Sequence, residues 1–499
     1  MFSSYSYDAA SNLLSASGQY SVGYAYTYDQ LNRRVSATSP PAFPTPVTFS
    51  YAYDALSRRT GMSDTLGGTA LYAYDGEDRL TSLTTPWGGV ITQSYDTAGR
   101  PLRLAYPNGL DADLSFESNT GRLATINHRA GTLAAPIAQY NHSYDIRGNL
   151  ATLQELTGTK SFGYDPIERL TGVTQTLPAP ATQVESYTYD TEDNRVASQI
   201  SAAYVTDPAN HVLADAINTY AWSTDGDLTS RTPKNGGVGY NFSSTFVGVN
   251  NQMRLDSIAG SDGSAISFYY DPYQRLVSRH WPAPRGDDAL YYDGPDVVLE
   301  LRYPSAGGSQ WVRYVHGPGA DQPLATEVYS SGAAPTPGAG SQYYYHADGE
   351  GSIRLLTDAN GQIANRYDYD YYAQAEVTEV EVRDGVHVGI AVDQRYQSGA
   401  VHTDIGVRIS NFFRVEDIEH EIGPVQLEIQ PQILVATGDR QIVLLGRDIA
   451  HGCAIRVRLR ILFSERCVGV GGLPLRRGSR LSKRRCAFHS RARAVASGS

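Results

Sequence analysis

The chain has 499 residues, with 36 tyrosines, 48 glycines and only three methionines, and 19% of its residues are charged. Because aromatic residues suit a pleated surface and glycine suits tight turns, this composition favours many short strands over long helices. The three cysteines, Cys453, Cys467 and Cys486, all lie near the end of the chain, so the part before them has no disulfide framework and no cysteine-based metal site. The three also lack a Cys-x-x-Cys spacing, so they support neither a zinc site nor a redox pair.

The formal net charge of −11 conceals an asymmetry. Residues 440–499 hold fourteen Lys and Arg against Asp448 and Glu465, so this segment carries +12 and the rest of the chain −23. Clustered basic residues attract phosphate, but few aromatic residues are interleaved for base stacking, so we expect no specific nucleic acid partner. No run of about 18 apolar residues predicts a transmembrane segment. Met1 leads straight into polar, strand-like residues, which predicts that there is no signal peptide.

The body of the chain is organised by an internal repeat. The dipeptide Tyr-Asp recurs at steps of 20 to 25 residues between most neighbours. Fixed-period self-similarity is the signature of an array that grows by stacking units, so the domain organisation follows the repeats. The repeat residues singled out are Tyr7, Asp8, Tyr28, Asp29, Tyr53, Asp54, Tyr74, Asp75, Arg79, Tyr95, Asp96, Tyr144, Asp145, Tyr164, Asp165, Arg169, Tyr189, Asp190, Tyr270, Asp271 and Arg275.

Each repeat has the pattern of a β-hairpin. Residues alternate with period two on both sides of a short turn-forming segment, as in Tyr74-Asp-Gly-Glu-Asp-Arg-Leu-Thr-Ser-Leu-Thr84. The Asp can accept backbone N–H groups in the turn, and the Arg or Asn that follows, such as Arg79 or Arg169, is placed to hydrogen-bond that Asp or a neighbouring carbonyl. One hairpin cannot bury its aromatic face alone, so we expect the hairpins to stack.

The repeated Tyr-Asp-x-x-x-Arg-Leu pattern resembles the Rhs and YD-repeat family, which includes bacterial polymorphic toxins, the shell subunits of insecticidal toxin complexes and the teneurins. The match covers residues 1–372. The resemblance implies an all-β fold in which antiparallel hairpin repeats spiral into an open or partial hollow shell. In toxin members the shell holds an inactive C-terminal effector, so the resemblance implies an effector domain or toxin cargo as the partner in the intact system.

A second stretch strengthens the resemblance, because residues 343–370 look like the segment just before the family's repeat-associated core. The residues that stand where the family pattern puts them are His346, Asp348, Gly351, Ser352, Arg354, Thr357, Asp358 and Gly361. Glu350 departs from the pattern, since its place is usually apolar. The core itself, with a Gly-Arg-Phe-like segment and an Asp-Pro-rich cleavage region, does not follow Asp370. The sequence therefore predicts a shell segment truncated before the core.

Candidate catalytic groups are few. His346 and Asp348 lie two residues apart and would share a face of one strand, but we favour a turn-stabilising role over proton transfer. The sequence contains no nucleophile elbow, no phosphate-binding Gly-Lys-Ser/Thr loop, no dinucleotide fingerprint and no histidine pair with metal-ligand spacing. We therefore expect no enzymatic activity, no cofactor and no metal.

Beyond Tyr372 the repeat chemistry is lost. Residues 373–439 are acidic and strand-prone, and residues 440–499 are basic and poor in aromatic residues. An effector domain, a nucleic-acid-binding tail and the product of a shifted reading frame are the alternatives, and the composition fits the third best, which predicts a poorly folded tail. The predicted organisation is a repeat shell over 1–372, with the pre-core segment at 343–370, followed by 373–439 and 440–499.

The leading functional hypothesis is structural. The chain is expected to be an encapsulation scaffold of an Rhs-type polymorphic toxin system, here a shell segment without a recognisable effector. The alternative is a secreted or surface repeat module whose aromatic strands bind carbohydrate or a receptor on a partner cell. Under either hypothesis we expect the chain to be cytoplasmic before export and to reach the outside through a specialised export system.

Overall fold

The computed structural model describes two units. The described residues are 4–18, 23–40, 43–176, 182–199, 201–247, 252–282, 286–303, 308–319, 322–369, 375–380, 427–428, 441–448, 454–460 and 495–497. Unit 1 comprises Met1–Val386 and Val392–Tyr396, and unit 2 comprises His387–Ala391 and Gln397–Ser499. Most of the predicted segments 373–439 and 440–499 lies outside the described residues.

The first sheet of unit 1 has eighteen strands, and each strand pairs antiparallel with the next along the chain. Its strands are β1 (Ser4–Tyr7), β2 (Leu13–Ser17), β3 (Gly23–Tyr28), β4 (Arg34–Thr38), β5 (Thr48–Tyr53), β6 (Arg59–Asp64), β7 (Thr69–Tyr74), β8 (Leu80–Thr84), β9 (Val90–Tyr95), β10 (Pro101–Ala105), β11 (Asp111–Phe116), β12 (Leu123–Arg129), β13 (Ala138–Tyr144), β14 (Leu150–Glu155), β15 (Gly158–Tyr164), β16 (Leu170–Thr176), β17 (Thr182–Tyr189) and β18 (Arg195–Ser198).

The second sheet of unit 1 continues the same meander with sixteen strands. Its strands are β19 (Val205–Thr206), β20 (Val212–Ala214), β21 (Asn218–Trp222), β22 (Leu228–Pro233), β23 (Tyr240–Val247), β24 (Gln252–Gly260), β25 (Ala265–Tyr270), β26 (Leu276–His280), β27 (Asp287–Asp293), β28 (Asp296–Tyr303), β29 (Gln310–His316), β30 (Pro323–Val328), β31 (Ser341–Ala347), β32 (Ile353–Asp358), β33 (Ile363–Tyr369) and β34 (Ala375–Val380). Unit 2 holds β35 (Leu427–Glu428), β36 (Gln441–Asp448), β37 (Ala454–Arg460) and β38 (Val495–Ser497).

The predicted all-β fold of antiparallel hairpin repeats is confirmed. No described residue is helical. The first sheet is open, because β1 pairs only with β2 among the described strands. The chain therefore forms an open array of hairpins, as expected for an open or partial shell.

The hairpin turns share one backbone design. In the turn after Tyr74, the Asp75 N–H donates to the Arg79 carbonyl at 3.0 Å, and Asp78 has a φ of +63°. The pairing register shifts just before the tyrosine, between Ala73 and Tyr74. This combination of a tight turn, a left-handed residue and a bulge matches the right-handed twist of the two strands, so the repeat sequence sets both the turn and the register.

Glycine fills the left-handed turn position in several repeats, and this predicts a stability effect. Gly99 has a φ of +83°, whereas Gly76 lies in the equivalent type of turn without a positive φ and with open space around it. We expect Gly99→Ala to destabilise unit 1 by about 1 kcal/mol, because a Cβ is disfavoured in the left-handed region. Gly76→Ala is the matched control and should be neutral. Urea unfolding followed by fluorescence measures both, and equal midpoints for the two variants would contradict this account.

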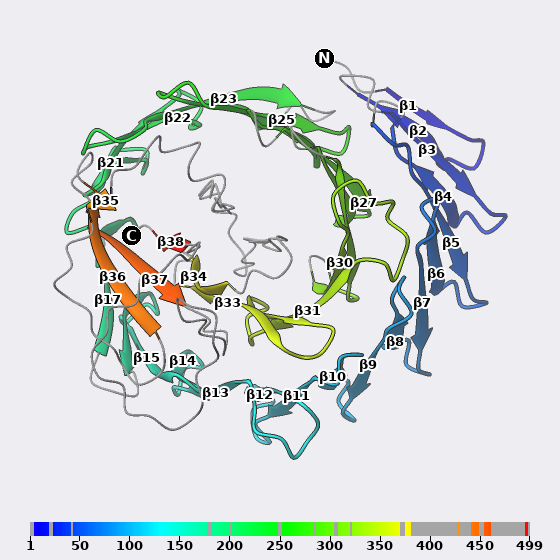
Figure 1. The fold of residues 1–499 in the computed structure, drawn as a ribbon, viewed down its shortest axis with the longest axis horizontal. Coiled ribbons are helices and arrows are strands. Elements are labelled where there is room, and N and C mark those ends of the chain that lie inside the picture. The colour runs from blue at the N-terminus through cyan, green and yellow to red at the C-terminus, as the bar shows by residue number, and fades with distance from the viewer. Residues whose placement is uncertain are drawn as a thin grey trace, which may run out of the picture. The chain divides into compact units, whose positions relative to one another are not determined.

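The chain winds back on itself within unit 1 (Figure 1). We call β1–β14 the first lap and β25–β33 the second lap. Side chains separated by about one turn of the spiral meet: Tyr24 and Asp271 are 247 residues apart, Tyr51 and Asp293 are 242 apart, and Trp87 and Tyr344 are 257 apart. The strands of the second lap therefore lie against those of the first.

The hydrophobic core fills the seam between the two laps. One cluster joins Phe43, Val47 and Phe49 of the first lap to residues such as Leu299 and Trp311 of the second. Further clusters join Leu83 and Ile91 to Leu324 and Tyr344, and Ile126 and Tyr140 to Leu355. Each lap thus buries its aromatic face against the other, which a single layer of hairpins could not do.

Candidate functional site

The recurring residues of each repeat build a turn around its aspartate. Asp75 Oδ1 accepts hydrogen bonds from the backbone N–H groups of Glu77 at 3.0 Å and Arg79 at 2.9 Å, and its Oδ2 accepts one from Arg79 Nε at 2.7 Å. The hydrogen bond predicted between the turn Asp and the following Arg is therefore present. The aspartates whose Oδ2 accepts such a bond from an arginine Nε are Asp29, Asp54, Asp75, Asp96, Asp165 and Asp271. The aspartates whose Oδ2 accepts from an asparagine amide instead are Asp8, Asp145 and Asp190.

The same residues also fasten each hairpin to the next one. The guanidinium of Arg58 lies over the ring of Tyr74, 5.2 Å from its centroid, and its Nη1 donates to the Asp75 carbonyl at 3.0 Å. The Tyr74 hydroxyl donates to the Arg59 carbonyl at 2.8 Å. We call this set of contacts the repeat ladder. The repeat tyrosines whose hydroxyls reach a carbonyl of the preceding hairpin are Tyr53, Tyr74, Tyr95, Tyr144, Tyr164, Tyr189 and Tyr270.

The first repeat tyrosines differ from the others. Tyr7 ends β1 and is 58% exposed. Tyr28 is partly buried against the cluster of Tyr24, Tyr26 and Ala37. Reasoning from the sequence placed the Asp–Arg pair correctly because both residues lie in one turn, but it missed the bonds between hairpins. The signal for them was the recurrence of Arg and Tyr at similar positions in successive repeats.

Acid should loosen the repeat ladder. The pKa of Asp29 is lowered from 3.8, chiefly by the hydrogen bond from the Arg33 backbone, which with the bond from the Arg33 side chain outweighs desolvation. A lowered folded pKa stabilises the fold above the unfolded value, and this contribution is lost as the pH falls through the folded pKa. We expect the urea midpoint to fall between pH 4 and pH 3, and Asp29→Asn to reduce that slope. A slope unaffected by the substitution would show that Asp29 is not linked to folding.

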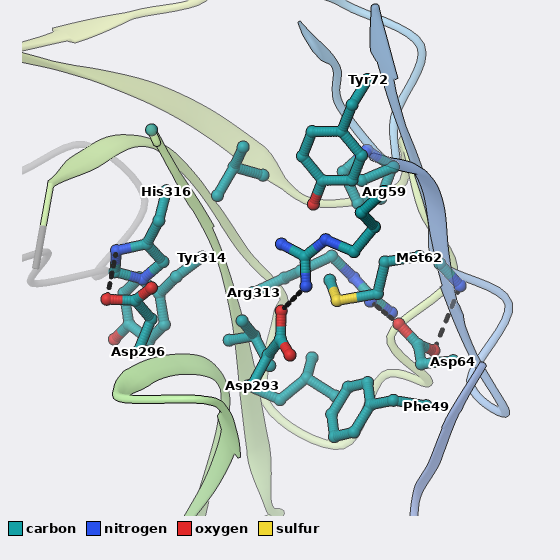
Figure 2. Close-up of a pocket in the computed structure, with 17 residues that line it drawn as sticks. Phe49, Arg59, Met62, Asp64, Tyr72, Asp293, Asp296, Arg313, Tyr314 and His316 are labelled. Carbon is teal, nitrogen blue, oxygen red and sulfur yellow. Dashed lines mark hydrogen bonds and ion pairs between the residues drawn. The ribbon is translucent and has the colours of Figure 1, made fainter. Parts of the chain in front are cut away.

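Two ion pairs cross the seam between the laps, one of them buried and the other partly exposed (Figure 2). Arg313 of β29 pairs with Asp64 of β6, and both side chains are 3% exposed. Arg59 of β6 pairs with Asp293 of β27, which also accepts a hydrogen bond from the Tyr51 hydroxyl at 3.1 Å. Buried charges need such partners, because an uncompensated one costs several kcal/mol. These residues were not identified from the sequence.

A small cavity lies beside these ion pairs, with a volume of about 40 Å³. Phe49 and Met62 line it on the first lap, and Tyr314 and His316 on the second (Figure 2). This space suits one or two water molecules and is far smaller than a site for an organic ligand. The cavity therefore belongs to the packing of the seam.

The pre-core residues meet the first lap. His346 Nδ1 lies 3.2 Å from Nδ1 of His128 on β12, and His346 Nε2 lies 2.8 Å from Thr357 Oγ1. Both ring nitrogens of His346 are thus engaged by partners other than Asp348. The alternative considered from the sequence, a His346–Asp348 pair, is wrong, because the pairing register shifts between His346 and Ala347.

The remaining pre-core positions form the turn and its contacts. Asp348 Oδ1 accepts hydrogen bonds from the backbone N–H groups of Glu350 and Ser352, each at 3.0 Å, which is the turn-stabilising role favoured from the sequence. Gly351 has a φ of +84° in that turn. Arg354 Nη2 reaches Glu155 Oε1 of β14 at 3.1 Å, with side chains 8% and 6% exposed. This buried pair is a third link between the laps.

The last pre-core residues contact the turn between β10 and β11. Asn108 Nδ2 donates to Thr357 Oγ1 at 3.0 Å and to the Asp358 carbonyl at 2.9 Å. A Cβ on Gly361, whose φ is +75°, would lie 3.3 Å from the Asn108 carbonyl oxygen. The residues of the pre-core motif therefore hold the second lap against residues 108–155 of the first lap.

Two other kinds of feature are absent from the described part of the chain. No group of three His, Cys, Asp or Glu residues there is arranged to hold a metal ion. No described helix has the length and apolar character needed to span a membrane.

Comparisons with known proteins agree with this architecture. The RHS repeat family model matches residues 74–111, which run from the end of β7 to the start of β11. The crystal structure of TcdB2-TccC3 without its hypervariable C-terminal region superposes with a TM-score of 0.53 at 17% identity, covering 71% of this chain and 20% of that one. The Tc holotoxin pore of Photorhabdus luminescens superposes with a TM-score of 0.52 at 18% identity, covering 73% and 20%.

A third similar structure, TcdB2-TccC3-Cdc42, has a TM-score of 0.52 at 16% identity over 75% of this chain. The chain spans about a fifth of the length of these proteins. At such low identities the likeness concerns the fold. No curated protein matches the sequence.

Proposed function

Since the chain is an RHS-repeat protein, we propose that it is a structural scaffold, a piece of shell wall that encapsulates cargo and does not catalyse a reaction. The observation that carries the proposal is the seam. Two laps of hairpins bury their aromatic faces against each other, and buried ion pairs link them. A wall that is two sheets thick and has a packed interior is suited to enclosing another molecule.

The cargo in the intact system is, in this proposal, an effector domain or toxin. The similar structures support it, because both contain TccC3, one of them is a Tc holotoxin pore, and this chain has the same fold over the part that superposes. Secretion as part of such a complex, through a specialised export system, belongs to the same proposal. Competition between cells would follow from the cargo and not from the wall.

The repeat ladder argues against the alternative of carbohydrate binding. A sugar stacks on an open aromatic face and needs free polar groups around it. The rings of Tyr53, Tyr74 and Tyr189 instead lie under arginines of the preceding hairpin, and their hydroxyls are bonded to backbone carbonyls. These tyrosines are committed to holding the array together.

Electron microscopy and a glycan array on the full purified chain test the proposal. We expect curved, hollow particles with a wall two sheets thick, and no binding to any glycan. Asp64→Ala, which breaks a seam ion pair, should remove the curved particles, whereas Glu77→Ala, which removes an exposed partner of Arg79, should leave them unchanged. Solid globular particles, or saturable binding to a glycan, would contradict the scaffold proposal.

A further inference from the structure

We propose that His128 and His346 form a proton-sensitive latch that holds the second lap on the first at neutral pH and releases it on acidification. The two rings come from different laps, from β12 and β31, and both are almost completely buried. Their centroids lie 5.0 Å apart at an interplanar angle of 85°. The inference rests on the seam alone and does not depend on the encapsulation proposed above.

The hydrogen-bond partners fix where every proton of the pair sits. His128 Nε2 lies 2.9 Å from the Ala347 carbonyl oxygen, which can only accept, so Nε2 carries a proton. In a neutral ring Nδ1 of His128 is then bare and accepts, so the facing Nδ1 of His346 must donate. His346 Nε2 is therefore bare as well and accepts from the Thr357 hydroxyl.

The chain of donors continues into the first lap. The Thr357 oxygen accepts in turn from Asn108 Nδ2 at 3.0 Å. Every ring nitrogen is thus satisfied, but only while both imidazoles are neutral. A proton added to His128 Nδ1 would place one N–H against another. A proton added to His346 Nε2 would force the Thr357 hydroxyl to turn away.

The surroundings offer no counterion for an added charge. The nearest rings are Tyr106, 4.7 Å from His346, and Tyr140, 6.1 Å from His128, measured between centroids. The charged groups of the neighbouring elements pair among themselves, since Arg354 contacts Glu155 and Asp348 and lies over Tyr140. In the described residues, no ion pair joins either ring to a carboxylate. Besides the partner ring, the titratable and charged side chains on the elements around the pair are Tyr106, Asp111, Asp113, Arg129, Tyr140, His142, Tyr144, Glu155, Tyr343, Tyr344, Tyr345, Asp348, Arg354 and Asp358.

Burial lowers the pKa of His128 to about 4 and that of His346 well below its usual value of 6.5. A histidine that is exposed when the seam opens would titrate near 6.5. Below about that pH, the open form therefore binds more protons than the closed form. Stability of the seam is then fully present above pH 6.5 and is lost as the pH falls toward 4. The turn aspartates lose their contribution mainly around and below their unfolded pKa of 3.8, so the range from pH 6.5 to 5 reports mainly on histidine.

Amide hydrogen exchange on the full chain measures the opening directly. We expect the protection factors of amides in β12 and β31 to fall by up to about 30-fold between pH 6.5 and 5.5, because each of two rings that titrates near 6.5 in the open seam contributes about fivefold. His346→Asn keeps a donor near the Nδ1 position and should reduce the fall to about fivefold. His128→Asn combined with His346→Asn should abolish it.

The control is His280→Asn, because His280 is an exposed histidine of β26 with a side chain 57% exposed. It should keep the wild-type slope. If the seam variants fail to fold, exchange of the imidazole C2 protons in the wild-type protein decides the matter. His128 and His346 should both titrate well below 6.5 there. Titration near 6.5, a seam protection independent of pH, or a slope that persists in the double variant would overturn the latch.

Discussion

Asp64→Asn is expected to destabilise unit 1 by about 3–5 kcal/mol, because it removes the charge that compensates a buried arginine and leaves Arg313 without a counterion in the seam. Asparagine keeps the Oδ1 acceptor that Asp64 presents to the Leu66 N–H at 2.8 Å, so the turn of β6 is retained. The loss therefore isolates the ion pair. Urea unfolding of the full chain at pH 7.5 gives the free energy, above the range in which the histidines titrate.

The double variant Asp64→Leu with Arg313→Met separates charge from packing. When both charges are removed and replaced by apolar groups of similar volume, neither is left uncompensated, so most of the stability should return. Glu77→Ala is the exposed control, since Glu77 pairs with Arg79 at 3.1 Å with a side chain 71% exposed, and it should cost less than about 1 kcal/mol. A single variant as stable as the wild type would mean that water reaches Arg313.

The hairpin array could be derived from the sequence because its contacts are local. Asp75 and Arg79 lie in one turn, so the pattern of residue types over a few positions contains both partners and the backbone that joins them. The same holds for the aspartate of the pre-core turn, Asp348, which bonds to backbone groups within four residues. Because the pattern recurs along the chain, the same hairpin is expected at every repeat. The fold class could therefore be predicted without any knowledge of the seam.

The seam could not be derived in the same way. Asp64 and Arg313 are 249 residues apart, and His128 and His346 are 218 apart, so no local pattern relates them. The position of each contact depends on how tightly the spiral winds, which the twist and bulges of many strands decide together. One signal was present: Arg313 stands among apolar residues in Trp311-Val-Arg-Tyr-Val315, and a charge inside an apolar strand indicates a buried partner somewhere else.

The aromatic anchors of the seam should carry the other large effect. Tyr291 of β27 is 1% exposed and packs edge-on against Phe43 of the first lap, with centroids 4.9 Å apart. Its hydroxyl donates to the Thr45 carbonyl at 2.8 Å, so both the ring and the hydroxyl join the two laps.

Tyr291→Ala is therefore expected to cost about 3–5 kcal/mol, since it deletes a buried ring and leaves a cavity that a stiff double sheet cannot collapse. Tyr291→Phe keeps the ring and should cost only about 1 kcal/mol, the value of one hydrogen bond. Tyr7→Ala removes a tyrosine that is 58% exposed and serves as the matched control, with an effect below 1 kcal/mol. Urea unfolding at pH 7.5 ranks the three variants. An alanine variant that loses no more than the phenylalanine variant would show that the ring does not hold the laps together and that the ion pairs alone close the seam.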